Sequence, residues 1–125
     1  MDSYLRSLAK SLYERRHLAA QVPVEDRADD QFAPIRGDCH VNVDKWCRLH
    51  PGHRPVRGWL VIEMIPFRRF HFIAHSVVKD LAGRRFDVTP QQAFTKHPFI
   101  EDEDIEEVYL LRAAYRKLVA IDHFL

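Results

Sequence analysis

Cys39 has the residue type and the position of a catalytic nucleophile. It lies in the stretch RGDCHVNVDKWC (residues 36–47), directly after Asp38, which is a good N-cap for a helix. A thiol with a free pKa of roughly 8.5 is a weak nucleophile, and it becomes reactive when a helix N-terminus and an imidazole together stabilise the thiolate. The position of Cys39 supplies the helix N-terminus. The imidazole must come from another part of the fold, with a third polar group to orient its ring.

His75 is the candidate for that imidazole, and Asp87 is the candidate for its orienting partner. His75 lies in a segment that reads as a buried strand, where an imidazole needs a polar partner. The two side chains share a face of the sheet if the hairpin between them has a three-residue loop centred near Ala82, because residues 75 and 89 then face each other and residue 87 is one diagonal step away. A two-residue loop would place Asp87 on the opposite face. We therefore predict the odd-length loop.

An oxyanion would need hydrogen-bond donors beside Cys39. The backbone amide of Cys39 is one available donor, and a second is usually required for strong stabilisation, each contributing on the order of 3 kcal/mol. Gln31, in the loop upstream of the predicted helix, is the candidate for the second donor.

Two helices are predicted in the first fifty residues. The leucines of the first segment form one helical stripe that a proline then stops, which predicts a helix over about 3–20. Residues 23–37 have no sustained period, contain two prolines and a glycine, and read as a surface connection. From Asp38 to about His50 the apolar side chains and both cysteines fall on one face, which predicts the second helix.

Three strands are predicted to follow. The segments rich in branched and aromatic residues are WLVIEMI (59–65), RFHFIAHSVVK (69–79) and RRFDVT (84–89). Neither face of the second segment is plainly polar, so it should be central in its sheet and covered on both sides. In the tail, acidic residues come first and basic ones later, which favours a helix from about residue 101, while LVAIDHF (118–124) is equally consistent with a strand at the sheet edge.

The composition is that of one domain spanning residues 1–125. At 125 residues and 46% hydrophobic content, the chain can bury one core and is too short for two ordinary domains. We divide it into an N-terminal helix within 1–22, a core that carries the candidate chemistry at 38–90, and a C-terminal element at 100–125.

Charge, hydropathy and cysteine usage narrow the function classes. A net charge of +1 from 19 basic and 18 acidic residues provides no overall field that attracts nucleic acid or an anionic membrane. No apolar run is long enough for a membrane span, and the first residues lack the apolar core of a signal peptide, so we expect a cytoplasmic protein. Cys39 and Cys47 would lie about 12 Å apart along one helix, beyond disulfide reach, and both are expected to be thiols, as in a reducing compartment.

The order of the candidate residues is similar to that of a known enzyme family. A cysteine at a helix start in GDC (37–39), a histidine in HSVV (75–78) and an aspartate in DVTP (87–90), with PVRGW (55–59) leading into the sheet, resemble the transglutaminase-like branch of the papain-like cysteine enzymes. The resemblance covers roughly residues 34–90. It implies an α+β fold in which a nucleophile-bearing helix packs on a small antiparallel sheet.

The family implies acyl transfer or amide hydrolysis through a thioester. By the match of motifs, Cys39 would be the nucleophile, His75 the base and Asp87 the residue that orients the base. We therefore expect a small cysteine hydrolase or acyltransferase that acts on a protein or peptide substrate and needs no cofactor. Water or an amine would resolve the thioester.

A zinc-binding domain is one alternative. Cys47, His50 and His53 could converge from the end of the second helix, with His71 as the fourth ligand. The spacing is less favourable than in most structural zinc sites, whose paired ligands lie about two to four residues apart.

His71 shares a strand face with His75 and could also replace it as the base.

A binding module without enzymatic activity is the other alternative. It would have the same fold and would dock a protein partner through the acidic run 101–107 and the edge that carries Arg68 and Arg69. In such a module the thiol of Cys39 would have no function.

Overall fold

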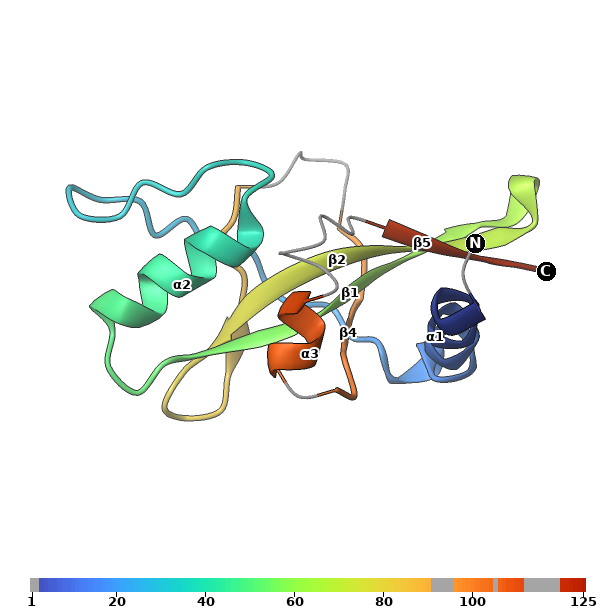
Figure 1. Ribbon diagram of the computed structural model, residues 1–125. Coiled ribbons are helices and arrows are strands. Elements are labelled where there is room, and N and C mark those ends of the chain that lie inside the picture. The colour runs from blue at the N-terminus through green and yellow to red at the C-terminus, as the bar shows by residue number, and fades with distance from the viewer. Residues whose placement is uncertain (1–2, 91–95, 105, 112–119) are drawn as a thin grey trace.

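The structure is an α+β fold built on one antiparallel sheet (Figure 1). The computed structural model describes residues 3–90, 96–104, 106–111 and 120–125. The helices in these residues are α1 (Ser3–Glu14), α2 (Cys39–Leu49) and α3 (Glu106–Leu110), and the strands are β1 (Arg54–Met64), β2 (Arg69–Lys79), β3 (Arg85–Phe86), β4 (Phe99–Glu101) and β5 (Ala120–Phe124). The α+β class expected from the sequence is confirmed.

β2 is the central strand of the sheet. It pairs with β1 along its whole length, and on its other edge it pairs with β5 from Arg69 to Ile73 and with β3 at Val78 and Lys79. β4 extends the sheet beyond β1. The central position predicted for residues 69–79 is confirmed, and it explains why neither face of this segment is polar.

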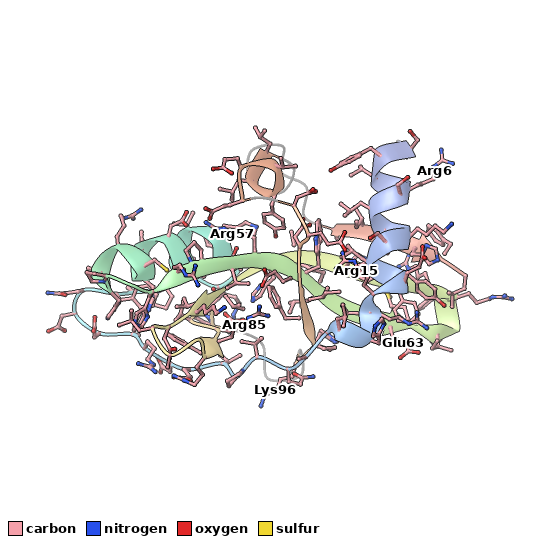
Figure 2. The ribbon with its side chains drawn as sticks, turned by 90° about the horizontal axis from the view of Figure 1, so that it is seen from below. Arg6, Arg15, Arg57, Glu63, Arg85 and Lys96 are labelled. Atoms are coloured by element: carbon pink, nitrogen blue, oxygen red, sulfur yellow. The ribbon has the colours of Figure 1, made fainter. Side chains whose placement is uncertain are left out.

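The two faces of the sheet are covered by different elements (Figure 2). α1 and α3 lie over the face that carries Trp59 and Phe72 and form a hydrophobic cluster with it. The segment that follows α1 crosses the opposite face, where Val56, Val77 and Phe99 are buried. α2 packs at the end of β2 next to β3, where the buried cluster consists of Phe32, Val43, Trp46, Val78, Phe86 and Val88. Consecutive residues of β2 therefore enter different environments.

The first helix is shorter than predicted. α1 ends at Glu14 and a 3-10 turn follows at Arg16–Leu18, whereas the leucine stripe predicted a helix to about Ala20. The prediction is wrong after Glu14 because the following backbone pairs with the sheet. Ala20 exchanges hydrogen bonds with β4, and Val24 forms a parallel bridge with Asp87.

The connection over residues 23–37 has no helix or strand, as predicted, but it is anchored in the core. Phe32 is 2% exposed and packs in the cluster around α2. The backbone of Ile35 is hydrogen-bonded to the side chain of Asn42. The sequence around Phe32 and Ile35 has no periodic pattern, and for this reason it predicts a surface loop.

The observed bounds of α2 and β2 agree with the predicted ones, but those of the other strands do not. β1 begins at Arg54 because its first residues pair with the end of β2, and β4 was not predicted. In the second hairpin Lys79 pairs with Arg85, so the loop over 80–84 has five residues centred on Ala82. The predicted length of three is wrong, whereas the odd parity and the centre are confirmed.

The tail contains a helix and a strand, but the predicted start of the helix near residue 101 is wrong, because Glu101 belongs to β4. α3 begins with Glu106 and Glu107, and β5 pairs with β2. Residues 112–119 lie outside the described part of the chain, so a helix there is not tested.

In the described residues no helix is long and apolar enough to cross a membrane. Both cysteines are free thiols, as expected.

Candidate active site

Cys39 is the first residue of α2, at the end of the helix where backbone N–H groups lack helical partners. Gly37, with a φ of 81°, turns the chain into the helix, and the carbonyl of Asp38 accepts the amide of Asn42 at 2.9 Å. Asp38 occupies the predicted N-cap position, although its side chain makes no capping hydrogen bond. The positive end of the helix dipole therefore acts on the sulfur.

Asn42 ties α2 to the segments on either side of the site. Its side-chain oxygen accepts the amide of Ile35 at 3.0 Å, and its nitrogen donates to the carbonyl of Ile35 at 2.8 Å and to Oγ1 of Thr89 at 3.0 Å. The side chain is buried, with 2% of the residue exposed. Asn42 thus fixes both the loop that precedes Cys39 and the chain that follows Asp87.

The structure brings His75 and Asp87 together. Nε2 of His75 lies 2.5 Å from Oδ2 of Asp87, and both residues are buried. The other carboxylate oxygen accepts the amide of Thr89 at 3.0 Å. Because Asp87 occupies Nε2, Nδ1 is the ring nitrogen left to interact with Cys39, whose thiolate is stabilised by the charge of His75.

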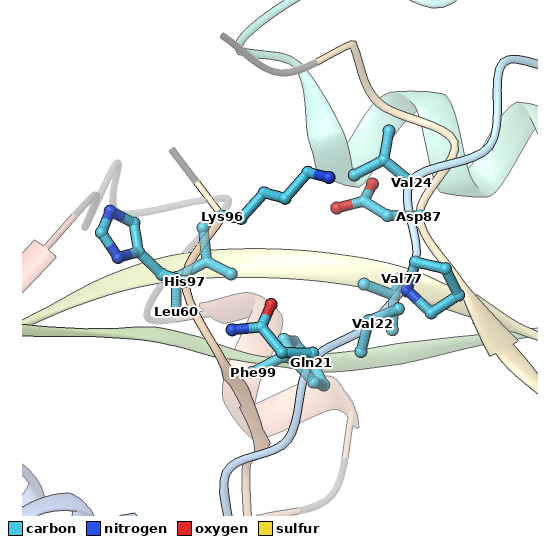
Figure 3. A pocket seen from close by; sticks show the side chains of 10 residues that line it. Gln21, Val22, Val24, Leu60, Val77, Asp87, Lys96, His97 and Phe99 are labelled. Atoms are coloured by element: carbon cyan, nitrogen blue, oxygen red, sulfur yellow. The ribbon is translucent and has the colours of Figure 1, made fainter. Parts of the chain in front are cut away.

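Asp87 is held in place by the segment that follows α1. Its amide donates to the carbonyl of Pro23 at 2.8 Å, and its carbonyl accepts the amide of Glu25 at 2.9 Å. Figure 3 shows Val24, which lies between these two residues, next to the carboxylate. The backbone that carries the carboxylate cannot turn away without breaking this pairing.

The thiol and the imidazole stabilise each other's charged forms. Burial opposes ionisation of Cys39, yet the hydrogen bond with His40 and charge interactions with His75 and His40 outweigh it and lower the pKa of the thiol to about 6. Burial likewise opposes protonation of His75, but the hydrogen bond with Asp87 and the negative charges of Asp87 and Cys39 raise the pKa of the imidazole to about 10. These shifts favour a thiolate beside an imidazolium at neutral pH. Such a pair can attack a carbonyl carbon and protonate the leaving group.

The strand around His75 is fixed on both faces. Gly58 lies opposite His75, and the ring of Phe99 occupies the space where a side chain at position 58 would lie, 6.4 Å from the imidazole between centroids. On the other face, the hydroxyl of Tyr109 donates to the carbonyl of Gly58 at 2.7 Å and accepts the amide of His75 at 3.2 Å. His75 is therefore held by its backbone as well as by its carboxylate partner.

Three residues that shape the site were not predicted as its partners: His40, Asn42 and Tyr109. Nδ1 of His40 lies 3.8 Å from the sulfur of Cys39. The sequence signal for Asn42 was a polar residue within one turn of the cysteine in an otherwise amphipathic helix. No local pattern marks Tyr109, because its place over β2 depends on how α3 packs.

Gln31 is not brought to the sulfur. It is exposed, and its backbone amide donates to Oδ1 of Asp29 at 2.8 Å. The neighbouring Phe32 turns into the core instead. Within the described residues no contact links Gln31 to Cys39, so the structure gives no support to Gln31 as an oxyanion donor.

The alternative zinc ligands are not brought together as one set: the rings of His50 and His53 lie 5.5 Å apart between centroids, but His71 is elsewhere on the sheet. The ring of Trp46 stacks on His50 at 3.7 Å between centroids, and its indole N–H donates to Nδ1 of His53 at 3.1 Å. His71 lies toward the other end of β2, with Nδ1 2.6 Å from Oδ1 of Asp122. Over the described ranges, no group of three or more ligand side chains could hold a metal ion. The structure does not assemble the proposed set of Cys47, His50, His53 and His71.

A cavity of about 410 Å³ lies on the face of the sheet opposite α1 and α3 (Figure 3). Leu60, Val77 and Phe99 contribute apolar surface, and Asp87 is part of the wall. Figure 3 shows the ammonium group of Lys96 pointing toward the carboxylate. The cavity therefore adjoins the residue that orients His75.

No protein-family model, curated protein or solved structure matches this chain.

Proposed function

We propose that the chain is a small cysteine hydrolase or acyltransferase with a papain-like, transglutaminase-like arrangement of Cys39, His75 and Asp87. The observation that carries the proposal is the 2.5 Å hydrogen bond between His75 and Asp87, because it leaves the other ring nitrogen for a thiol at a helix N-terminus. The His75–Asp87 hydrogen bond and the charge interaction between His75 and Cys39 support a role for these three groups as one unit. This is the order of roles that nucleophilic catalysis requires.

The first half of the reaction forms a thioester. The thiolate of Cys39 attacks the carbonyl carbon of an amide or ester, and the electron pair of the C=O bond moves to oxygen. The backbone amide of Cys39, at the helix N-terminus, is a donor for the resulting oxyanion. The intermediate then collapses, the bond to the leaving amine or alcohol breaks, and His75 transfers its Nδ1 proton to that group.

The second half releases the acyl group. His75, now neutral, takes a proton from water or from an amine as this acceptor attacks the thioester. The C–S bond breaks and the thiolate is restored beside the imidazolium. Asp87 holds Nε2–H throughout, so the ring keeps the same tautomer in both halves. A protein or peptide is the proposed acyl donor.

Acylation by an activated ester tests the proposal. The wild-type chain and the variants Cys47→Ala, Cys39→Ala and His75→Ala are incubated with p-nitrophenyl acetate, and the acetylated residue is identified by mass spectrometry. We expect acetylation of Cys39 in the first two, none at that site in Cys39→Ala, and a rate reduced by about 10²-fold or more in His75→Ala. Cys47→Ala is the matched control, because it removes the other thiol.

The opposite result is equally clear. If folded His75→Ala is acylated as fast as the wild type, the imidazole does not activate the sulfur and the proposed reaction is wrong. A Cys39 with the reactivity of an ordinary thiol would leave the non-enzymatic binding module as the better account.

A further inference from the structure

A second imidazole lies beside the sulfur, and it is held by the residue that follows the candidate base. Nδ1 of His40 lies 3.8 Å from Sγ of Cys39 and 2.6 Å from Oγ of Ser76. His75 and Ser76 are consecutive residues of β2, so their side chains point to opposite faces of the sheet. Two imidazoles therefore lie near the sulfur. His75 belongs to one face of β2, and His40 is hydrogen-bonded to Ser76, which points to the other face.

Ser76 is itself fixed by a buried arginine. NH1 of Arg57 donates to Oγ of Ser76 at 2.9 Å. The same guanidinium forms ion pairs with Asp44 of α2 at 2.6 Å and Glu106 of α3 at 3.0 Å, and the residue is 6% exposed. Figure 2 shows Arg57 near α2 on the helical side of the sheet. The hydroxyl that holds His40 is thus anchored to two helices through one side chain.

We propose that His40 donates a second hydrogen bond to the thiolate of Cys39 through Nδ1–H, and that Ser76 holds the ring in place for this. A guanidinium can only donate, so Arg57 uses one of the two acceptor positions of Oγ and leaves the other for an N–H of His40. The sulfur and Oγ then share the Nδ1 proton as acceptors.

This assignment deepens the proposed function and rests on it for its mechanistic meaning. When His75 has given its proton to the leaving group, it has no N–H for the sulfur, yet the thiolate must leave again when the thioester is resolved. The hydrogen bond that His40 donates to the sulfur is kept through these steps, because His40 does not give up its proton. It would make the departure of the thiolate independent of the protonation state of His75.

Other charged and titratable groups also face this pair. His75 faces the sulfur from β2, Tyr109 of α3 interacts electrostatically with Cys39, and its ring lies 5.8 Å from that of His40 between centroids. The positive charge of Arg57 is balanced by its two carboxylate partners. A test must therefore change the donor on His40 without changing any of these groups.

Two substitutions of His40 separate its hydrogen bond from its shape. His40→Phe keeps a ring and removes the donor, whereas His40→Asn keeps an N–H near the position of Nδ1. Both are made in a Cys47→Ala background, and the pKa of Cys39 is measured from the pH dependence of alkylation by iodoacetamide. We expect His40→Phe to raise the thiol pKa by about one unit and His40→Asn to raise it less.

The control is His123→Phe, which changes an imidazole that stacks on Tyr13 away from the site. It should leave the thiol pKa unchanged. An unchanged or lowered thiol pKa in folded His40→Phe overturns the inference, because the ring then does not donate to the sulfur. If His40→Phe does not fold, the ¹⁵N chemical shift of His40 in the wild type decides: a protonated Nδ1 supports the donor, and an unprotonated Nδ1 excludes it.

The same measurement on His75→Ala keeps the two proposals apart. If the thiol pKa rises in His75→Ala and stays unchanged in His40→Phe, the inference on His40 is wrong and the proposed function stands. If it rises in His40→Phe alone, His40 is a donor and the role proposed for His75 is wrong.

Discussion

Gly58 lies directly opposite His75 where β1 pairs with β2, and β4 passes so closely that position 58 has no room for a side chain. A Cβ atom there would overlap the carbonyl oxygen of Ile100 and lie 2.6 Å from Cζ of Phe99. The small residue thus lets β4 and an aromatic ring close over the strand that carries the candidate base.

Gly58→Ala should therefore destabilise the fold and disturb the site together. We expect a loss of about 3 kcal/mol in the free energy of unfolding, because the obstructing oxygen belongs to the backbone of β4. Gly83→Ala is the control: its φ of 86° disfavours alanine, yet no atom lies closer than 3.8 Å, so the expected cost is about 1 kcal/mol. Urea unfolding measures both. An equal cost for the two would show that β4 can move aside easily.

The two cysteines should differ in reactivity at pH 7. The pKa of Cys39 is lowered to about 6, whereas burial raises that of Cys47 to about 11. The larger thiolate fraction of Cys39 outweighs the lower intrinsic nucleophilicity of its thiolate, so iodoacetamide should label it at least about tenfold faster. Peptide mass spectrometry gives the two rates. Equal labelling of the folded chain would contradict the site.

The labelling rate of Cys39 should depend on pH with a midpoint near 6. The thiolate is present above the lowered pKa and is lost as the pH falls through it, so the rate should fall below about pH 6 and be level at neutral pH. Unfolding in urea should move the midpoint up to about 8.5, the value of a free thiol. A midpoint near 8.5 in the folded chain would rule out the stabilised thiolate.

Asp87→Asn should keep the orientation of His75 and lower the pKa of its imidazole. The amide oxygen can still accept Nε2–H, but the negative charge that helps to raise the pKa is gone. A weaker imidazolium stabilises the thiolate less, so the thiol pKa of Cys39 should rise by about one unit. NMR titration follows the imidazole, and alkylation follows the thiol. Asp87→Ala should have the larger effect, since it also removes the hydrogen bond.

Asn42→Ala should cost about 3 kcal/mol, because it removes three hydrogen bonds, one of them with the buried hydroxyl of Thr89. Urea unfolding gives the value. Val41→Ala is the matched control on the same helix: this residue is 43% exposed, and its truncation should change the stability by about 0.5 kcal/mol or less. A small effect of Asn42→Ala would mean that the loop before Cys39 is held by other contacts.

The sequence allowed the pairing of His75 with Asp87 to be predicted, because side-chain direction alternates strictly along a strand. An odd-length loop was sufficient to place both on one face, even though the loop is longer than predicted. The position of Cys39 at a helix start also followed from local signals, namely a polar residue before an amphipathic run.

The rest of the site depends on tertiary packing that local patterns do not encode. β4 has three residues and is a strand because β1 and Ala20 pair with it. His40 became a partner of the sulfur through Ser76, which is close to it only after α2 packs on the sheet. Gln31 is the opposite case, since its nearness to Cys39 along the chain is not accompanied by a contact with the thiol in the described residues.

If Cys39 is the nucleophile that we propose, the pairing of Asp87 with Pro23 and Glu25 would couple the reactivity of the thiol to the completion of folding. During synthesis Cys39 emerges long before Asp87, and until the early segment has closed over the later one we expect an ordinary thiol with a pKa of about 8.5. An unfinished chain would then carry no activated nucleophile. The cell would be protected from a reactive sulfur on a nascent or misfolded copy without any separate inhibitor.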